Sequence, residues 1–189
     1  MSAKHHFSPE RQALREKMMP AMTILRRFGL AEGQHLADLG CGQGYFTLKA
    51  AELVGPQGLV SAIDIDEENL QVLRQKAEQQ GLSERISTIL THDESIPLPD
   101  RQFDRALIAN VLHELKNPQD YLVETRRILK NGGEVWVIEW QKKETPMGPP
   151  LAERRLPEEW VALLEQAGFS DVWLQIFGST HILMRAVNS

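Results

Sequence analysis

One stretch decides the fold of this chain of 189 residues: Ala37-Asp38-Leu39-Gly40-Cys41-Gly42-Gln43-Gly44-Tyr45-Phe46. It joins the end of an apolar strand to the start of a helix through three alternating glycines. Glycine has no Cβ, so it permits a positive φ angle and a close approach of the backbone to a ligand, while the following helix points free N–H groups at anionic atoms. The stretch therefore predicts a cradle for a small molecule that carries a carboxylate or a phosphate.

Two carboxylates accompany this loop. Asp38 lies just before it, and Asp64 closes a second apolar run, 59–63, twenty residues after Gly44. A carboxylate at that second position suits hydrogen bonds from ribose hydroxyls and excludes a 2′-phosphate. Because both acids lie at the ends of neighbouring strands, we expect one ligand with an amine and a ribose.

The spacing of the glycines bears on the identity of the cofactor. The loop reads Gly-x-Gly-x-Gly, whereas a nicotinamide-binding loop normally reads Gly-x-Gly-x-x-Gly. A Tyr-x-x-x-Lys match, from Tyr45 to Lys49, is similar to the short-chain dehydrogenase signature, but it falls inside the helix of the cofactor loop rather than far downstream. An NAD-dependent oxidoreductase therefore remains an alternative with less support.

Five motifs follow one another along the chain: Asp38-Leu39-Gly40-Cys41-Gly42-Gln43-Gly44, Ala62-Ile63-Asp64-Ile65-Asp66, Thr91-His92-Asp93, Phe103-Asp104-Arg105-Ala106 and Leu129-Lys130-Asn131-Gly132-Gly133. Together, from residue 33 onward, they resemble class I S-adenosylmethionine-dependent methyltransferases, and the chain is similar to small proteins related to the ubiquinone/menaquinone C-methyltransferases. The resemblance implies an α/β, Rossmann-like doubly wound fold whose mostly parallel, seven-stranded sheet has an antiparallel C-terminal strand. It also implies S-adenosylmethionine as the cofactor and S-adenosylhomocysteine as the product.

Apolar runs and turn residues predict where the elements lie. Strands are expected at 35–40, 59–64, 86–90, 105–109, 134–139, 172–177 and 181–186. Helices are expected from a cap at Ser8 to Phe28 with a break at Pro20, then from Gly44, from Asp66 to Gly81, from Pro118 to Lys130 and from Pro157 to Gly168. The short link 178–180 suits an antiparallel hairpin. We expect one domain, with a helical segment 1–32 covering the site of a methyltransferase domain 33–189.

Composition narrows the class of function. The formal net charge of −5 gives no electrostatic attraction to nucleic acid, so a small-molecule acceptor is expected. Cys41 is the only cysteine, which excludes an internal disulfide and a multi-thiolate metal site, and no other metal site is expected. No apolar run is long enough for a membrane span and no leader-type segment follows the N-terminus, so a cytoplasmic protein is expected. The oligomeric state stays open.

The resemblance assigns residues to the cofactor. It implies that Asp38 binds the amino group, that Asp64 binds the ribose and that Ile65 packs against the adenine. Asp93 or Glu94 would bind the adenine amino group, and Asn110 would lie beside the methionine half. The loop residues of the set are Gly40, Cys41 and Gly42. Structural alternatives are a cap for Asp38, core packing for Ile65 and ordinary turns for Asp93 and Asn110.

On the acceptor side, His113 follows the fourth expected strand closely enough to face the methyl group. Histidine is the natural base near neutral pH, although a structural or capping role is an alternative. The residues expected around the acceptor entrance are Trp140, Lys142, Lys143, Arg155 and His181. As a group they suggest an anionic acceptor. Taken one by one, the lysines and the arginine are also typical of an ordinary solvated surface.

The function expected is methyl transfer from S-adenosylmethionine to a small-molecule acceptor. Two alternatives remain at this point: the NAD-dependent oxidoreductase, and a non-catalytic protein that binds S-adenosylmethionine.

Overall fold

The computed structural model describes residues 9–145 and 147–189, so the cap expected at Ser8 lies outside the described residues. The helices are α1 (Pro9–Met18), α2 (Ala21–Phe28), α3 (Tyr45–Val54), α4 (Glu67–Gln79), α5 (Pro118–Ile128) and α6 (Pro157–Gln166). The strands are β1 (His35–Leu39), β2 (Leu59–Asp64), β3 (Ile86–Leu90), β4 (Phe103–Ala109), β5 (Leu129–Trp140), β6 (Ser170–Phe177) and β7 (His181–Val187). Short 3-10 turns are η1 (Ser83–Arg85), η2 (Leu112–Glu114) and η3 (Leu151–Glu153).

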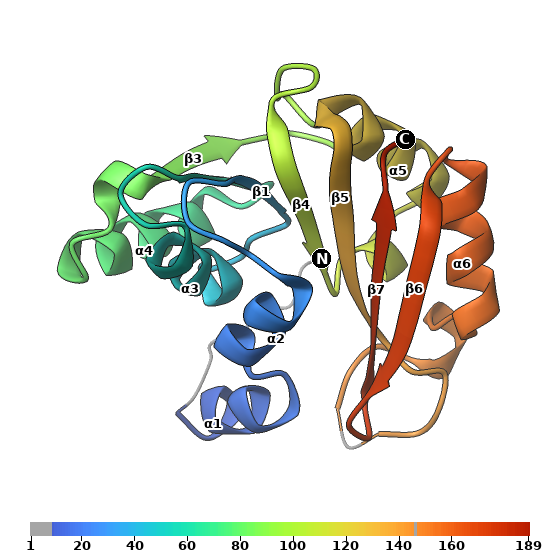
Figure 1. Cartoon of the computed structure of the whole chain (residues 1–189). Helices are drawn as coiled ribbons and strands as arrows, with labels where there is room; N and C mark the ends of the chain where they lie inside the picture. The colour runs from blue at the N-terminus through green and yellow to red at the C-terminus, as the bar shows by residue number, and fades with distance from the viewer. Residues whose placement is uncertain (1–8, 146) are drawn as a thin grey trace.

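The strands form one seven-stranded sheet in the order β3-β2-β1-β4-β5-β7-β6 (Figure 1). The pairs β2–β3, β1–β2, β1–β4 and β4–β5 are parallel, and β7 is antiparallel to both β5 and β6. This arrangement confirms the mostly parallel sheet with an antiparallel C-terminal strand. It also places β7 between β5 and β6.

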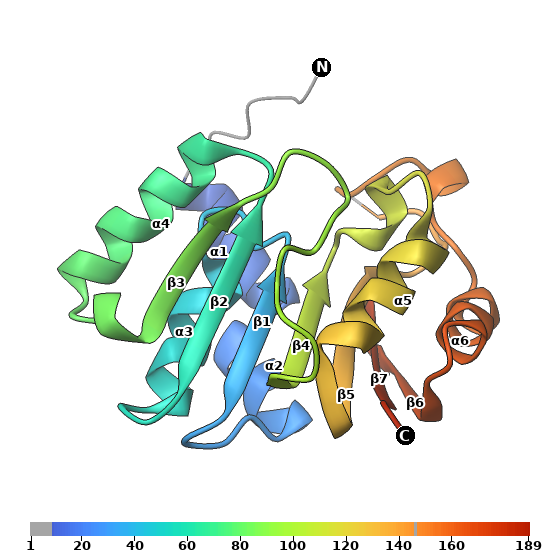
Figure 2. The same cartoon turned by 90° about the horizontal axis from the view of Figure 1, so that it is seen from above.

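Helices cover both faces of the sheet, as a doubly wound fold requires (Figure 2). Side chains of α2, α3 and α4 share one buried cluster, and those of α5 and α6 share the other. Alternate side chains of a strand point to opposite faces. On β5, Trp136 and Ile138 therefore belong to the first cluster while Val135 and Val137 belong to the second.

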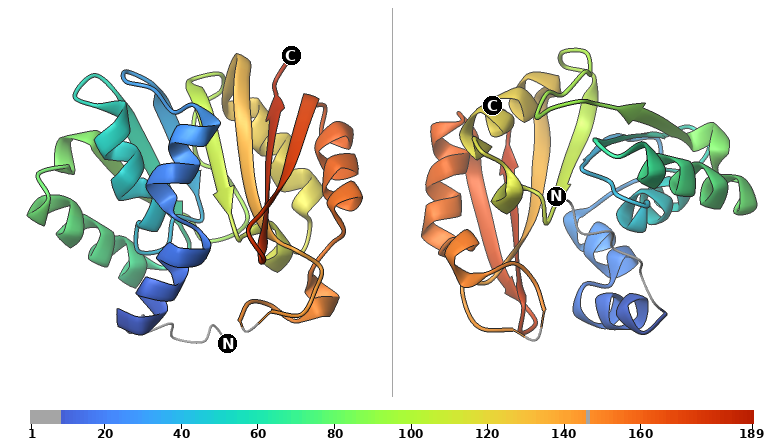
Figure 3. Two further views of the ribbon diagram at one scale, coloured as in Figure 1. Left: turned by 60° about the horizontal axis from the view of Figure 1, so that its bottom comes forward. Right: turned by 180° about the vertical axis from the view of Figure 1, so that it is seen from behind.

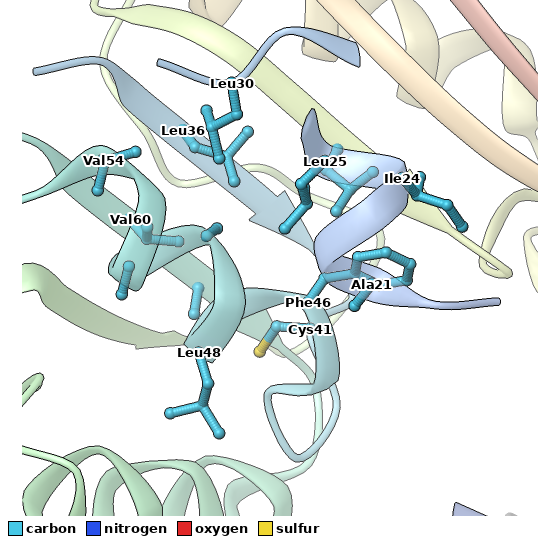
Figure 4. Packing of buried hydrophobic residues seen from close by; sticks show 14 of the residues in the cluster. Ala21, Ile24, Leu25, Leu30, Leu36, Cys41, Phe46, Leu48, Val54 and Val60 are labelled. Carbon is cyan, nitrogen blue, oxygen red and sulfur yellow. The ribbon is translucent and has the colours of Figure 1, made fainter. Parts of the chain in front are cut away.

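The segment before β1 is part of the core rather than an appendage. Pro20 separates α1 from α2, and Gly29 ends α2 with a φ of 87°. Figure 4 shows Ala21, Ile24 and Leu25 of α2 beside residues of β1 and α3. Both views of Figure 3 place α1 and the loop after β5 at the same end of the molecule.

The boundary expected between the helix from Pro118 and the next strand is wrong. The helix predicted to continue to Lys130 ends at Ile128, and Leu129 already pairs with Phe103 as part of β5. Asn188, just beyond β7, donates from Nδ2 to the carbonyl oxygens of Leu129 at 2.9 Å and Lys130 at 3.1 Å. These carbonyls are bonded by a residue far along the chain, so the local sequence does not reveal where the helix stops.

Candidate active site

The residues of the site gather where β1, β2, β4 and β5 end. In parallel strands these carboxyl ends share one edge of the sheet, and ligands of open α/β sheets bind outside that edge. The loop that follows β1 and the loops that follow β4 and β5 reach this edge together with α1 (Figure 1). The sheet thus brings segments that are distant in sequence to one place.

Two glycines of the loop serve different purposes. A Cβ on Gly40 would lie 2.4 Å from Cγ2 of Val111, so glycine is needed there for the loop to pack against the segment after β4. A Cβ on Gly42 would meet nothing within 4 Å. Both residues have positive φ angles, 78° and 53°. The backbone at Gly42 therefore borders open space in which a ligand can approach it.

Asp38 ends up as a buried carboxylate at the end of β1. Thr47 of α3 donates a hydrogen bond from Oγ1 to Oδ2 of Asp38 at 2.6 Å. Burial raises the pKa of Asp38 to about 6, and the nearby charge of Asp64 acts in the same direction. A buried acid of this kind gains from a cationic partner.

Asp64 ties the end of β2 to the loop. Its Oδ2 accepts a hydrogen bond from the amide of Gly42 at 2.7 Å, and its Oδ1 accepts one from the amide of Asp66 at 2.9 Å. The amide of Gly42 is therefore engaged by a carboxylate of the protein. Asn69 donates a third hydrogen bond, from Nδ2 to Oδ1 of Asp64 at 3.3 Å. A carboxylate has about four acceptor sites, so Asp64 retains one of them for a hydroxyl donor.

Ile65 follows Asp64 and is 70% exposed, whereas the core alternative would require burial. An apolar side chain presented beside a ribose-binding acid suits packing against a flat ring.

The two acids after β3 differ in their surroundings. Asp93 is exposed and accepts a hydrogen bond from the amide of Ser95 at 2.8 Å; hydrogen bonding from Ser95 lowers its pKa. Glu94 accepts hydrogen bonds from the amides of Lys116 at 2.9 Å and Asn117 at 3.4 Å, and so holds the segment before α5. Of the two, Asp93 is the more available to a ligand.

These groups fit S-adenosylmethionine. The cofactor carries an ammonium, a ribose and an adenine, and the corresponding features are the buried carboxylate of Asp38, the carboxylate of Asp64 and the exposed side chain of Ile65. Cys41, between them, is buried, and burial raises the pKa of its thiol, which leaves it a packing residue in the loop.

Asn110 follows β4 in a left-handed conformation, with a φ of 59°. Its Nδ2 lies 3.3 Å from Nε2 of His181 and 3.7 Å from Sδ of Met19. Its Oδ1 is buried and has no hydrogen-bond partner within residues 9–145 and 147–189. A buried acceptor without a donor is costly, so this oxygen suits a donor supplied by a ligand.

His113, in η2, contacts a carboxylate that the sequence reasoning missed. Nδ1 of His113 lies 2.8 Å from Oε2 of Glu139, and both side chains are buried. Burial lowers the pKa of His113, but the hydrogen bond and the charge of Glu139 outweigh it, so the net pKa is raised. The signal was available: Glu139 is an acid at the end of a buried strand, as Asp38 and Asp64 are.

His181 meets Trp140 because the register of β5 and β7 makes them partners. Their ring centroids are 4.2 Å apart, and Nδ1 of His181 lies 2.8 Å from Oγ1 of Thr180. Burial, with the charges of Arg15 and Arg154, lowers the pKa of His181 to about 4. This histidine is therefore neutral at pH 7.

Two of the basic residues expected around the entrance, Lys142 and Arg155, are engaged elsewhere. Lys142 pairs with Glu159 of α6 at 3.8 Å, and the guanidinium of Arg155 lies over the ring of Trp160, 5.4 Å from its centroid. The neighbouring Arg154 is the buried one, with its guanidinium 5.3 Å from the centroid of Trp140. At this side of the site the structure therefore places Arg154, not the expected Arg155.

Arg154 holds the loop after β5 together. Its Nε donates to the carbonyl oxygen of Pro149 at 2.9 Å, and Nη1 donates to those of Lys143 at 2.6 Å and Gln141 at 3.2 Å. Carbonyl oxygens solvate a guanidinium but do not cancel its charge. The loop therefore keeps a positive charge beside Trp140.

The described part of the chain holds neither a metal-site candidate nor a candidate membrane span. Within it, no group of three or more His, Cys, Asp and Glu side chains is placed to hold a metal ion. Nor does any of its helices have the length and apolar character needed to cross a membrane.

Comparison with known proteins matches residues 30–179 to a family model described as "Methyltransferase domain". Over 125 residues, the chain is 34% identical to the ubiquinone/menaquinone biosynthesis C-methyltransferase UbiE of Yersinia enterocolitica. The match covers 66% of this chain and 49% of that protein, so the chain spans about half the length of the curated relatives it matches.

Solved structures agree with this match. A SAM-dependent methyltransferase from Aquifex aeolicus has a TM-score of 0.87 and 30% identity, and the alignment covers 97% of this chain and 100% of that one. The [4+2]-cyclase SpnF has a TM-score of 0.76 at 22% identity, over 89% of this chain and 80% of that one, which shows a shared fold alone. None of these matches supports the oxidoreductase alternative.

Proposed function

Since this chain belongs to the family of S-adenosylmethionine-dependent methyltransferases, we propose that it methylates a small acceptor from which His113 removes a proton. The contact between His113 and Glu139 carries this proposal. When Nδ1 donates to the carboxylate, the lone pair of the imidazole resides on Nε2. The base is then oriented by a group that also stabilises its protonated form.

The cofactor, when bound, supplies a methyl group on a positively charged sulfur that is already a good leaving group. The protein has mainly to align the acceptor and exclude water, which can contribute on the order of 7–11 kcal/mol. We assign Asp38 to the ammonium, Asp64 to the ribose, Ile65 and Asp93 to the adenine, and Asn110 to the methionine half. The loop residues Gly40, Cys41 and Gly42 would line the same ligand.

An acceptor with an anionic group is the second part of the proposal. Lys142 and Arg155 no longer support it, because each is engaged on the α6 side. Support comes instead from Arg154, which keeps its charge beside Trp140. The acceptor would lie with its anionic group toward this arginine, its flat part near Trp140 and His181, and its nucleophilic atom toward His113.

A screen of acceptors that follows release of S-adenosylhomocysteine tests the function. Each candidate acid is paired with its methyl ester, and we expect turnover with the acid and at least tenfold less with the ester, because the ester lacks the charge that Arg154 attracts. Equal turnover of both would contradict the anionic acceptor. Release with no acceptor, or tighter binding of NAD than of S-adenosylhomocysteine, would contradict methyl transfer itself.

Glu139→Gln tests the proton step with the acceptor so found. Loss of the negative charge should lower the pKa of His113, so the rising limb of the kcat profile should move to lower pH. Glu134→Gln, on the same strand but away from the sheet edge of the site, serves as the matched control. An unmoved limb in Glu139→Gln would show that His113 is not the base.

We infer that the described part of the N-terminal segment, residues 9–32, covers the site, because α1 and the loop after β5 lie at the same end of the molecule (Figure 3). The cytoplasmic location stays a prediction.

A further inference from the structure

A chain of three polar side chains reaches the site from the turn before β7. Oγ1 of Thr180 lies 2.8 Å from Nδ1 of His181, and Nε2 of the same ring lies 3.3 Å from Nδ2 of Asn110. Thr180 and His181 are buried. Asn110 follows β4, and His181 begins β7, which is antiparallel to β5 and therefore starts at the edge where β4 ends. The chain thus connects a turn far along the sequence to a residue of the site.

The surroundings of Asn110 decide which way its amide faces. Sδ of Met19, 3.7 Å from Nδ2, can accept a hydrogen bond but cannot donate one. In the reverse orientation the carbonyl oxygen would face this sulfur, and an NH2 group with two hydrogens would lack a partner. The observed orientation leaves one acceptor, Oδ1, which is buried and has no hydrogen-bond partner in the part of the chain that the structure describes. It is the less costly of the two, because fewer polar groups lose their partners.

This orientation fixes the tautomer of His181. Burial lowers the pKa of the ring to about 4, so the ring is neutral and only one of its nitrogens carries a hydrogen. Because Nδ2 of Asn110 donates to Nε2, that hydrogen resides on Nδ1 and is donated to Thr180. The hydroxyl of Thr180 therefore favours a ring that accepts at Nε2, and this ring holds the amide of Asn110 with Oδ1 free.

We propose that Thr180 and His181 are positioning residues, which hold Oδ1 of Asn110 ready to accept a hydrogen bond from an O–H or N–H group of the molecule that is methylated. The proposal rests on the proposed function, which places that molecule near Trp140 and His181. The methionine half of the cofactor ends at the sulfur that carries the methyl group, so a residue beside that half also borders the molecule that receives the methyl. Asp38 is already assigned to the ammonium of the cofactor. The site would thus select acceptors that carry a protic group in addition to an anionic one.

Nitrogen-15 NMR of the histidine rings tests the first step on the ligand-free protein. The wild type and Thr180→Ser should have the hydrogen of His181 on Nδ1. Thr180→Val removes the group to which Nδ1 donates, so the hydrogen should move to Nε2 and the amide of Asn110 should reverse. Ser179→Ala removes an exposed hydroxyl from the same turn and should change nothing. A wild type with the hydrogen on Nε2 would overturn the proposal.

Paired probes test the second step, by calorimetry on the protein saturated with S-adenosylhomocysteine. A dihydroxybenzoic acid carries a carboxylate, a flat ring, one hydroxyl that can be methylated and one that can donate. Its analogue has fluorine in place of one hydroxyl, which keeps the shape but donates nothing. The wild type and Thr180→Ser should bind the dihydroxy acid about five- to a hundredfold more tightly than the better fluoro analogue. Thr180→Val should reduce this preference to twofold or less and keep its affinity for S-adenosylhomocysteine within twofold of the wild type.

Each other outcome counts against a different assignment. Equal binding of the two probes by the wild type would mean that Oδ1 does not bind the acceptor. Weaker binding of S-adenosylhomocysteine by Thr180→Val, with the preference unchanged, would mean that Oδ1 of Asn110 binds the cofactor instead. Failure of the saturated protein to bind any of these acids would refute the anionic acceptor of the proposed function, whereas a hydrogen on Nε2 of His181 in the wild type refutes the positioning role alone.

Discussion

Asp64 and Glu139 occupy the same position in two strands, since each is a carboxylate at or next to the carboxyl end of a buried strand of one sheet. The shortest hydrogen bonds of Asp64 come from main-chain amides of the loop and of the turn beside it, whereas the shortest hydrogen bond of Glu139 is with the titratable ring of His113. An acid that fixes a backbone shapes a binding site. An acid that fixes an imidazole sets where a proton can go. We therefore expect changes near Asp64 to alter affinity and changes near Glu139 to alter turnover.

The variant His113→Ala is the strongest test of this difference between affinity and turnover. If His113 removes a proton, turnover should fall by about 10²–10⁴-fold, because proton transfer by a positioned group contributes that much. The affinity for S-adenosylhomocysteine, measured by calorimetry, should stay within twofold of the wild type. A parallel loss of affinity would mean that the two halves of the site are not separable.

The ionisation of Asp38 should make the stability of the protein depend on pH. Its pKa is raised from 3.8 to about 6, so between these values the folded protein holds more protons than the unfolded one. Stability should therefore fall as pH rises through this window, by at most about 3 kcal/mol, since one pKa unit corresponds to about 1.4 kcal/mol. Denaturant midpoints from pH 4 to 7 measure the effect, and Asp38→Asn should abolish it.

Binding should change with pH in the opposite sense, because an ammonium favours the ionised acid. The affinity for S-adenosylhomocysteine should rise about tenfold from pH 5 to pH 7 in the wild type. If Asp38→Asn keeps that rise, another group is responsible for it.

Asp64→Ala should weaken S-adenosylhomocysteine by about tenfold or more, because a hydrogen bond to a charged group is worth about 1.5–3 kcal/mol. Here the structure adds a second expectation. The same carboxylate accepts the amide of Gly42, so the thermal midpoint of the ligand-free protein should fall as well. Differential scanning calorimetry measures it, and an unchanged affinity would show that the ribose lies elsewhere.

Ile65→Ala should have the smallest effect. Removing part of an apolar contact with a ring costs about 1 kcal/mol, or about fivefold in affinity. The side chain is 70% exposed, so the midpoint of the ligand-free protein should not move. A drop in that midpoint without a change in affinity would restore the alternative that Ile65 only packs within the protein.

The strand, glycine loop and helix of the cofactor half could be predicted from the sequence, because they are contiguous and the physical demands on a tight turn are visible in the residues themselves. The roles assigned there to single residues stay predictions. His113 could be named from its place after β4, and whether it is catalytic stays a prediction. Its partner Glu139 was missed because it was interpreted only as the end of a strand, although an acid at that position was a signal in the sequence.

Two other features depend on contacts that adjacent residues do not reveal. Arg154 rather than Arg155 is buried, because Arg154 follows η3 and donates to carbonyl oxygens of the preceding loop. The end of α5 is decided by Asn188, whose Nδ2 bonds to Leu129 across 59 positions of the chain. Both features are determined by tertiary contacts, so the periodicity of the sequence does not predict them.

Because β7 lies between β5 and β6, the N-terminal and C-terminal halves of the sheet are expected to form at different times. The unit β1-α3-β2 can close by itself, since its contacts are local and local contacts form fastest. β6 pairs with β7 and has no pairing with β5, so it joins the sheet only after His181–Val187 is available. Proteins are synthesised from the N-terminus. In a chain growing on the ribosome we therefore expect the glycine loop, proposed to hold the cofactor, to form long before Trp140 meets His181, where we propose that the acceptor lies.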